Sequence, residues 1–160
     1  MKKTVLSSAF IALSLGLTGC ISVIDASDSK DARVSYSSVN PSDMRKIEAA
    51  VYDYFDGQGL ADYDRLDRAF NDNAAMFGVR ENESGDEYLR VWPDMNAVLK
   101  RWGDNPNPHG ERESEILSVD VTDGRIATVH FKSADRFYDV LTLVKIGGDW
   151  EIAAKVFVSQ

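Results

Sequence analysis

The stretch that decides the fold reads Phe137-Tyr-Asp-Val-Leu-Thr-Leu-Val-Lys-Ile146, then Gly147-Gly148, then Asp149-Trp-Glu-Ile-Ala-Ala-Lys-Val-Phe157. Both outer runs are rich in β-branched and aromatic residues. A glycine pair between two such runs predicts a β-hairpin with a two-residue turn. Residues that pair across the two strands then share one face of the sheet.

A regular ladder that starts at this turn pairs Ile146 with Asp149 and defines one face of the hairpin. That face carries Asp139, Leu141, Leu143, Trp150, Ile152, Ala154 and Val156. Asp139 is the one acid in this set, and it lies deep in its strand. It is therefore the first candidate for a functional side chain. The same ladder predicts that Lys145 and Lys155 fall on opposite faces.

Helical signals fill the first part of the chain. Asn40 is a good N-cap before Pro41, so a first helix is predicted from Pro41 to about Asp56, ending at Gly57. Tyr54 lies on its apolar stripe and is expected to point inward. Asp62 is expected to cap a short second helix with Tyr63 on its buried side. A third helix is predicted after Pro93, with Met95, Val98, Leu99 and Trp102 at helical spacing.

Strand signals complete the order of elements. Short strands are expected at residues 74–79 and 88–92, with a turn over residues 80–86 between them. From Glu115 the pattern alternates, and Asp123-Gly124 predicts a hairpin turn. The sequence thus predicts an α-α-β-β-α half followed by a four-stranded antiparallel meander. Helices segregated from an antiparallel sheet make an α+β domain.

The N-terminus is typical of an export signal. Lys2 and Lys3 precede an apolar run, Val5 to Leu17, that is short for a bilayer span. Leu17-Thr-Gly-Cys20 resembles the bacterial lipobox, which implies cleavage before Cys20 and attachment of palmitate-type acyl chains to it. We therefore predict a lipoprotein signal peptide at 1–19, a lipidated cysteine and flexible tether at 20–39, and one domain at 40–160.

Charge and sorting signals narrow the class of protein further. The net charge of −8 makes nucleic acid an unfavourable partner. Ile21 follows the lipobox cysteine, and resemblance to the sorting rule of Gram-negative bacteria implies the outer membrane, with the domain in the periplasm. The predicted membrane contact is thus the lipid on Cys20.

Several motifs of the predicted domain share their order with a known superfamily. They are Tyr54-Phe-Asp-Gly57 with Asp62, Phe70 to Ala74, Phe137-Tyr-Asp-Val-Leu-Thr-Leu143, and Gly148-Asp-Trp-Glu-Ile152 with Lys155-Val-Phe157. They resemble the nuclear-transport-factor-2-like (NTF2-like) superfamily, and more narrowly its SnoaL-like and "putative lumazine-binding" branch. The resemblance covers residues 41–158. It implies a curved sheet that wraps around the first helix as a cone, with a pocket at its wide mouth.

Ketosteroid isomerase, of the same superfamily, offers a comparison for the site. Its oxyanion hole pairs a tyrosine with a protonated sheet aspartic acid. Tyr54 precedes Asp62 by eight residues, as that tyrosine precedes the acid of the second helix, and Asp139 matches the sheet acid. The position of the isomerase's general base falls on Gly78, which cannot move a proton. The resemblance therefore implies the binding half of the machinery without the reacting half.

The candidate ligand-binding residues are Tyr54, Asp139, Trp92, Trp102, His130 and Lys155. Four of them also have a structural alternative: Tyr54 as a core tyrosine, Asp139 as a structural acid, Lys155 as a surface lysine and His130 as a sheet histidine. The chain has two histidines and no metal-ligand spacing, so we expect neither a metal nor a cofactor.

Three functions remain open at this point, and the first is favoured. It is a lipid-anchored periplasmic domain that binds a small, partly apolar ligand or a protein partner without catalysis. The second is a SnoaL-like isomerase, cyclase or hydrolase that uses Asp139 as acid or base. The third is an envelope protein that forms a homodimer through the outer face of its sheet.

Overall fold

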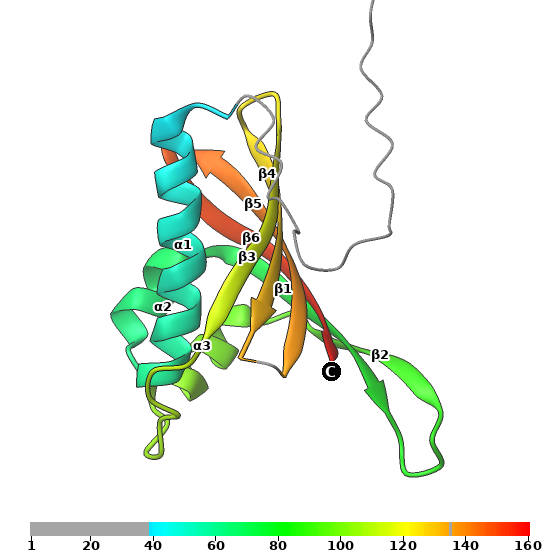
Figure 1. Ribbon diagram of the computed structural model, residues 1–160. Coiled ribbons are helices and arrows are strands. Elements are labelled where there is room, and N and C mark those ends of the chain that lie inside the picture. Colours follow the sequence, from blue (N-terminus) through cyan, green and yellow to red (C-terminus); the bar gives the residue numbers. More distant parts are fainter. Residues whose placement is uncertain (1–38, 135) are drawn as a thin grey trace, which may run out of the picture. The chain divides into compact units, whose positions relative to one another are not determined.

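The computed structural model describes residues 39–134 and 136–160, in which three helices pack against one six-stranded sheet (Figure 1). The elements are α1 (Pro41–Leu60), α2 (Tyr63–Ala69), β1 (Phe70–Glu81), β2 (Glu87–Trp92), α3 (Met95–Gly103), β3 (Ser114–Thr122), β4 (Ile126–Ser133), β5 (Phe137–Ile146) and β6 (Asp149–Ser159). The predicted signal peptide, Cys20 and the tether up to residue 38 lie outside the described residues. Among the described residues, no helix is long and apolar enough to cross a membrane.

The strand order is β2-β1-β6-β5-β4-β3. Strands β3 to β6 form the predicted antiparallel meander, and β2 pairs antiparallel with β1. The long strand β1 pairs in parallel with β6, which joins the two halves into one sheet. The predicted α+β class and the order of elements are therefore confirmed.

Helix α1 begins as predicted, because the Asn40 side chain accepts a hydrogen bond from the Ser42 backbone N–H at 2.8 Å. The prediction that it ends at Gly57 is wrong, since it continues to Leu60. Gly57 serves close packing instead. A Cβ there would lie 3.0 Å from Leu66 Cγ on α2. The missing side chain lets α2 approach the last turns of α1.

Helix α2 is capped as expected, with the Asp62 side chain accepting from the Arg65 backbone N–H at 3.1 Å. The prediction that Tyr63 lies on its buried side is wrong, because Tyr63 is 42% exposed. Strand β1 is also longer than predicted and includes Arg80. The expected turn over residues 80–86 therefore shortens to the segment between Glu81 and Glu87.

The decisive hairpin pairs as predicted from Ile146 and Asp149 back to Leu143 and Ile152. A bulge at residue 153 then shifts the register by one. In a β-bulge, two residues of one strand oppose a single residue of the other, so the facing of every later side chain changes.

Beyond the bulge, Lys155 pairs with Leu141 and Phe157 pairs with Asp139. Lys155 and Phe157 are therefore buried on the inner face. The prediction that Ala154 and Val156 take these places is wrong. Lys145 pairs with the buried Trp150 and forms an ion pair with Asp43 of α1, so Lys145 and Lys155 share the inner face and do not lie on opposite faces.

The core fills the space between the helices and this inner face. Its largest fully buried side chains include Tyr54, Phe55, Phe131, Ile47, Leu66, Met95, Leu99, Leu141, Leu143 and Ile152. Burying each large aliphatic side chain contributes about 1.5–3 kcal/mol. The charged group of Lys155 lies within this apolar layer, and it marks the site.

Candidate ligand-binding site

Three buried polar side chains from different elements form one chain of contacts. The Tyr54 hydroxyl of α1 donates to Asp139 Oδ2 of β5 at 2.9 Å. Lys155 Nζ of β6 contacts Asp139 Oδ1 as an ion pair. Their exposed fractions are 2% for Tyr54, 1% for Asp139 and 4% for Lys155. Buried charge is unfavourable unless it is paired and hydrogen-bonded, and here both conditions hold for the carboxylate.

Burial shifts the pKa values of Tyr54 and Lys155 in this group of contacting side chains. Burial raises the pKa of Tyr54 well above its ordinary value, and the neighbouring charge of Asp139 raises it further. Burial lowers the pKa of Lys155, although Asp139 opposes the shift by favouring the ammonium form. The Lys155 Nζ also lies 5.1 Å and 4.8 Å from the ring centroids of Tyr54 and Phe157. These rings contribute cation–π contacts to the ammonium group.

A cavity of about 160 Å³ opens beside these contacting side chains. Its lining residues are Tyr54, Gln58, Met76, Arg80, Trp92, Arg101, Trp102, Phe137, Lys155 and Phe157. The structure thus brings the predicted residues Tyr54, Trp92, Trp102 and Lys155 together at one cavity. Asp139 is not among its lining residues. The carboxylate lies behind the two side chains that bind it, and it orients them toward the cavity.

His130 does not join this group, and we remove it from the candidate site. It pairs with Val140 on β5 and is exposed, whereas its neighbours Val129 and Phe131 point into the core. Strand alternation accounts for the difference, because neighbouring residues point to opposite faces. His130 therefore lies on the outer face of the sheet.

Sequence reasoning missed six lining residues: Gln58, Met76, Arg80, Arg101, Phe137 and Phe157. Phe157 reaches the cavity because of the bulge, which no periodicity reveals. Arg80 was placed in a turn that proved to be strand. Arg101 precedes the predicted Trp102 on α3, and it carries no signal of its own.

A family model described as "Putative lumazine-binding" matches residues 42–158. The chain belongs to this family. The match spans the whole described domain apart from its ends, and it includes every residue that lines the cavity. No curated protein matches the sequence.

Solved structures confirm that this member of the lumazine-binding family has the NTF2-like fold. An NTF2-like protein of unknown function from Shewanella baltica superposes with a TM-score of 0.62 at 20% identity, covering 78% of this chain and 98% of that one. A similar protein from Methylobacillus flagellatus gives 0.62 at 21% identity, with coverages of 77% and 96%. A ketosteroid isomerase-like protein from Erwinia carotovora gives 0.53 at 16% identity, with coverages of 75% and 98%.

The position expected for a general base is closed in this lumazine-binding family member. Gly78 lies on β1 opposite Phe157 of β6. A Cβ built at Gly78 would lie 2.5 Å from Phe157 Cζ. The aromatic ring therefore occupies the space that a basic side chain would need. Among the described residues, no group of three His, Cys, Asp or Glu side chains could hold a metal ion.

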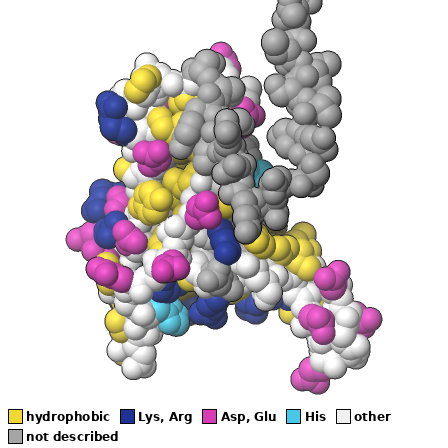
Figure 2. All heavy atoms as spheres, viewed as in Figure 1, with side chains coloured by type: hydrophobic (Ala, Val, Ile, Leu, Met, Phe, Trp, Pro, Cys, Tyr) yellow, Lys and Arg dark blue, Asp and Glu magenta, His cyan; other side chains and the backbone are white. Residues whose placement is uncertain are grey.

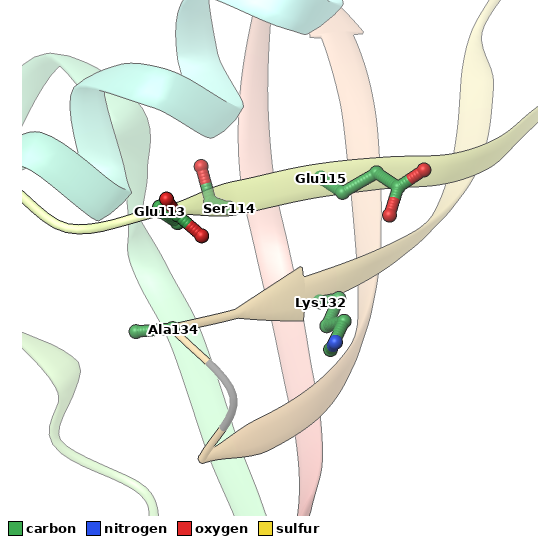
Figure 3. Close-up of a pocket in the computed structure, with 5 residues that line it drawn as sticks. All are labelled: Glu113, Ser114, Glu115, Lys132 and Ala134. Carbon is green, nitrogen blue, oxygen red and sulfur yellow. The ribbon is translucent and has the colours of Figure 1, made fainter.

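A second hollow lies where β3 begins and β4 ends, and Figure 3 shows its lining. Glu113, Ser114, Glu115, Lys132 and Ala134 surround a volume of about 120 Å³. In Figure 3 the side chains of Ser114, Glu115 and Lys132 point in different directions. Ligand sites usually combine an apolar wall with polar groups that converge, so the cavity beside Lys155 is the stronger candidate.

Proposed function

We propose that this domain binds a small, partly apolar ligand in the cavity beside Lys155, without catalysing a reaction. The observation that carries the proposal is that an aromatic wall, formed by Trp92, Trp102, Phe137 and Phe157, lines the same cavity as two buried hydrogen-bonding groups, those of Tyr54 and Lys155. Such a combination is typical of small-molecule sites. The family description supports ligand binding in general. No residue of the cavity demands lumazine itself.

A binding role without catalysis is supported by the contacts that Asp139 already makes within the protein. The two Asp139 oxygens contact Tyr54 and Lys155, and Asp139 does not line the cavity. In ketosteroid isomerase the equivalent acid is protonated in an apolar site. Here the corresponding acid, Asp139, is ion-paired with the buried Lys155. Together with the closed position at Gly78, this favours a binding role.

The experiment is a fluorescence titration of the full-length protein with indole, benzamide and benzoate. Trp92 and Trp102 line the cavity, so an occupant should change their emission. Gln58→Trp should block the cavity from its α1 side and abolish the change, whereas Gln58→Ala should retain it. Equal binding by Gln58→Trp and the unaltered protein would place the ligand elsewhere and end the proposal.

The enzyme alternative rests on one observation, the buried hydrogen bond between Tyr54 and Asp139 at 2.9 Å. A SnoaL-like isomerase, cyclase or hydrolase would use Asp139 as acid or base. Mass spectrometry of ligands after incubation tests this. A new product that forms with the unaltered protein but not with Asp139→Asn, while binding persists, would favour the enzyme.

We further propose that the domain is tethered to the outer membrane and faces the periplasm. Support comes from the export signal, the lipobox ending at Cys20 and Ile21 after it. Several acyl chains on one residue give firm anchoring, because each buried methylene contributes about 0.8 kcal/mol. Metabolic labelling with a palmitate analogue should mark the protein, and Cys20→Ser should remove both label and membrane fraction. A labelled Cys20→Ser protein would refute the lipobox.

A second copy of the chain is the proposed protein partner. Apolar side chains are exposed across the outer face of the sheet: Leu89, Val91, Tyr138, Val156 and Val158. They are continuous, because Phe77 of β1 pairs with both Val91 and Val156. Contiguous apolar surface of this kind marks interaction sites.

A further inference from the structure

The walls of the cavity carry cationic side chains and no acidic ones. Arg80, Arg101 and Lys155 line it, and none of its lining residues is Asp or Glu. This is unexpected for a chain of net charge −8. Figure 2 shows several basic side chains at the lower edge of this face of the domain, acidic and basic side chains mixed on the helical side, and acidic side chains at the end of the β1–β2 hairpin. The cavity is therefore a positive region on an acidic protein.

Two of these cations have no ion-pair partner among the described residues. In the part of the chain that the structure describes, neither Arg80 nor Arg101 forms an ion pair with an acid, whereas Lys155 is paired with Asp139. The Arg80 guanidinium lies 5.3 Å from the ring centroid of Phe157, which holds it against the cavity wall. A guanidinium stacked on a ring is preorganised and keeps its donors available for a carboxylate.

Further arginines surround the same aromatic wall. Arg90 lies 4.6 Å from the ring of Trp92, and Arg136 lies 5.3 Å from the ring of Phe137. They do not line the cavity, but they add positive potential to its surroundings. A cavity with low-dielectric walls and charges of one sign concentrates ligands of the opposite sign.

From this arrangement we propose that the cavity binds small organic carboxylates, with one flat ring inside and the carboxylate held between Arg80 and Arg101. The inference rests on the proposed ligand-binding function and names its ligand class. The ring packs against Trp92 and Phe157. Where the ligand carries a ring oxygen, such as a carbonyl or hydroxyl group, the Lys155 ammonium donates a hydrogen bond to it, because the Tyr54 hydroxyl proton is already donated to Asp139.

The size of the cavity agrees with one ring. Its volume is about 160 Å³. An engineered apolar cavity of about 150 Å³ in another protein holds benzene. A single ring of that size matches the cavity volume, so its carboxylate is placed at the side where the arginines lie. A cation of the same shape would be repelled there, and a neutral amide would lack the charge-assisted hydrogen bonds.

The experiment compares benzoate with benzamide, which have the same ring and differ in charge, on the full-length protein by tryptophan fluorescence. Two charge-assisted contacts in partly exposed positions predict at least tenfold tighter binding of benzoate at low salt. The preference should narrow as the salt concentration rises. The double variant Arg80→Gln with Arg101→Gln should bring the two affinities within about twofold, with benzamide binding retained.

Arg125→Gln is the matched control, because Arg125 is ion-paired with Asp123 in a hairpin turn away from the cavity. It removes a positive charge without touching the lining, and it should leave the preference unchanged. Equal binding of benzoate and benzamide would overturn the carboxylate proposal while leaving a small-molecule site intact. An equal loss of preference in Arg125→Gln would also overturn it. Failure of both probes to bind would overturn this inference together with the proposed function.

Discussion

At the scale of single residues, the burial of the Asp139–Lys155 ion pair carries the largest energies. Both side chains are almost fully buried, so water stabilises neither charge. Such a pair holds position well but contributes little net stability, because the attraction mainly offsets desolvation. The effect of the ion pair is to fix the position of the Lys155 ammonium group. The carboxylate fixes the ammonium group at the inner wall of the cavity, where a ligand would meet it.

We predict that Lys155→Met lowers the free energy of unfolding by about 3–5 kcal/mol at neutral pH, since it leaves a buried carboxylate without its cation. Adding Asp139→Asn to Lys155→Met should restore most of that loss, because the remaining groups are neutral. Urea denaturation of the single and double variants measures both steps. A double variant no more stable than Lys155→Met would show that the two side chains are not coupled.

The Tyr54 hydroxyl predicts an alkaline dependence. The folded state raises the pKa of Tyr54 above its ordinary value of 10.0, chiefly by burial. The unfolded chain therefore releases the Tyr54 proton at a lower pH than the folded protein does. The contribution of this group to the free energy of unfolding is complete below the unfolded pKa and is lost as the pH rises from there through the folded pKa. Tyr54→Phe removes the ionisable group. Its free energy of unfolding should fall less steeply between about pH 9 and about pH 11 than that of the unaltered protein. Parallel curves for the two proteins would contradict the assignment.

At the scale of elements, sequence patterns predicted the features that depend on residue alternation and on local turn and cap residues. The hairpin turn at Gly147-Gly148, the inward direction of Asp139 and the capping of α1 by Asn40 were all confirmed. Lys155 was predicted as a site residue, but the regular ladder gave it the wrong face. The bulge depends on how β6 fits between β5 and the parallel β1, and the residue at position 153 gives no sequence signal for it.

The two arginines of the cationic lining were beyond sequence reasoning for a related reason. Arg80 and Arg101 lie on β1 and α3, and the parallel pairing of β1 with β6 brings the first of them to the cavity. That pairing joins segments far apart in the chain, so no local pattern encodes it. Composition also argued against such a site, since the chain as a whole is acidic.

The contact between β1 and β6 gives a prediction at this scale. Gly78→Ala would place a Cβ 2.5 Å from the Phe157 ring. Overpacking of this kind costs about 1–3 kcal/mol, and the ring must move toward the cavity. Thermal and urea unfolding should show the loss, and the double variant Gly78→Ala with Phe157→Leu should recover part of it. Additive losses in the double variant would mean that the two positions do not compete for the same space.

At the scale of the whole molecule, the two faces of the sheet have different surroundings. The inner face meets the helices and holds the buried pair and the cavity. The outer face is apolar at Val156 and Tyr138 and exposed to solvent in the described domain. The proposed ligand site inside and the proposed interaction surface outside could therefore change independently, because neighbouring residues of one strand point to different faces.

The outer face gives the last prediction. Val156 is 41% exposed at the centre of the apolar set, and a charge there should prevent a second copy from packing against it. Val156→Glu should therefore convert a dimer of the full-length protein to a monomer in sedimentation velocity runs, with an unchanged circular dichroism spectrum. Leu60→Glu is the control, since Leu60 is 45% exposed at the end of α1, away from the sheet face. Its sedimentation should match the unaltered protein. If Val156→Glu and the unaltered protein sediment alike, this face does not bind a second copy, because a buried glutamate at its centre would be strongly unfavourable.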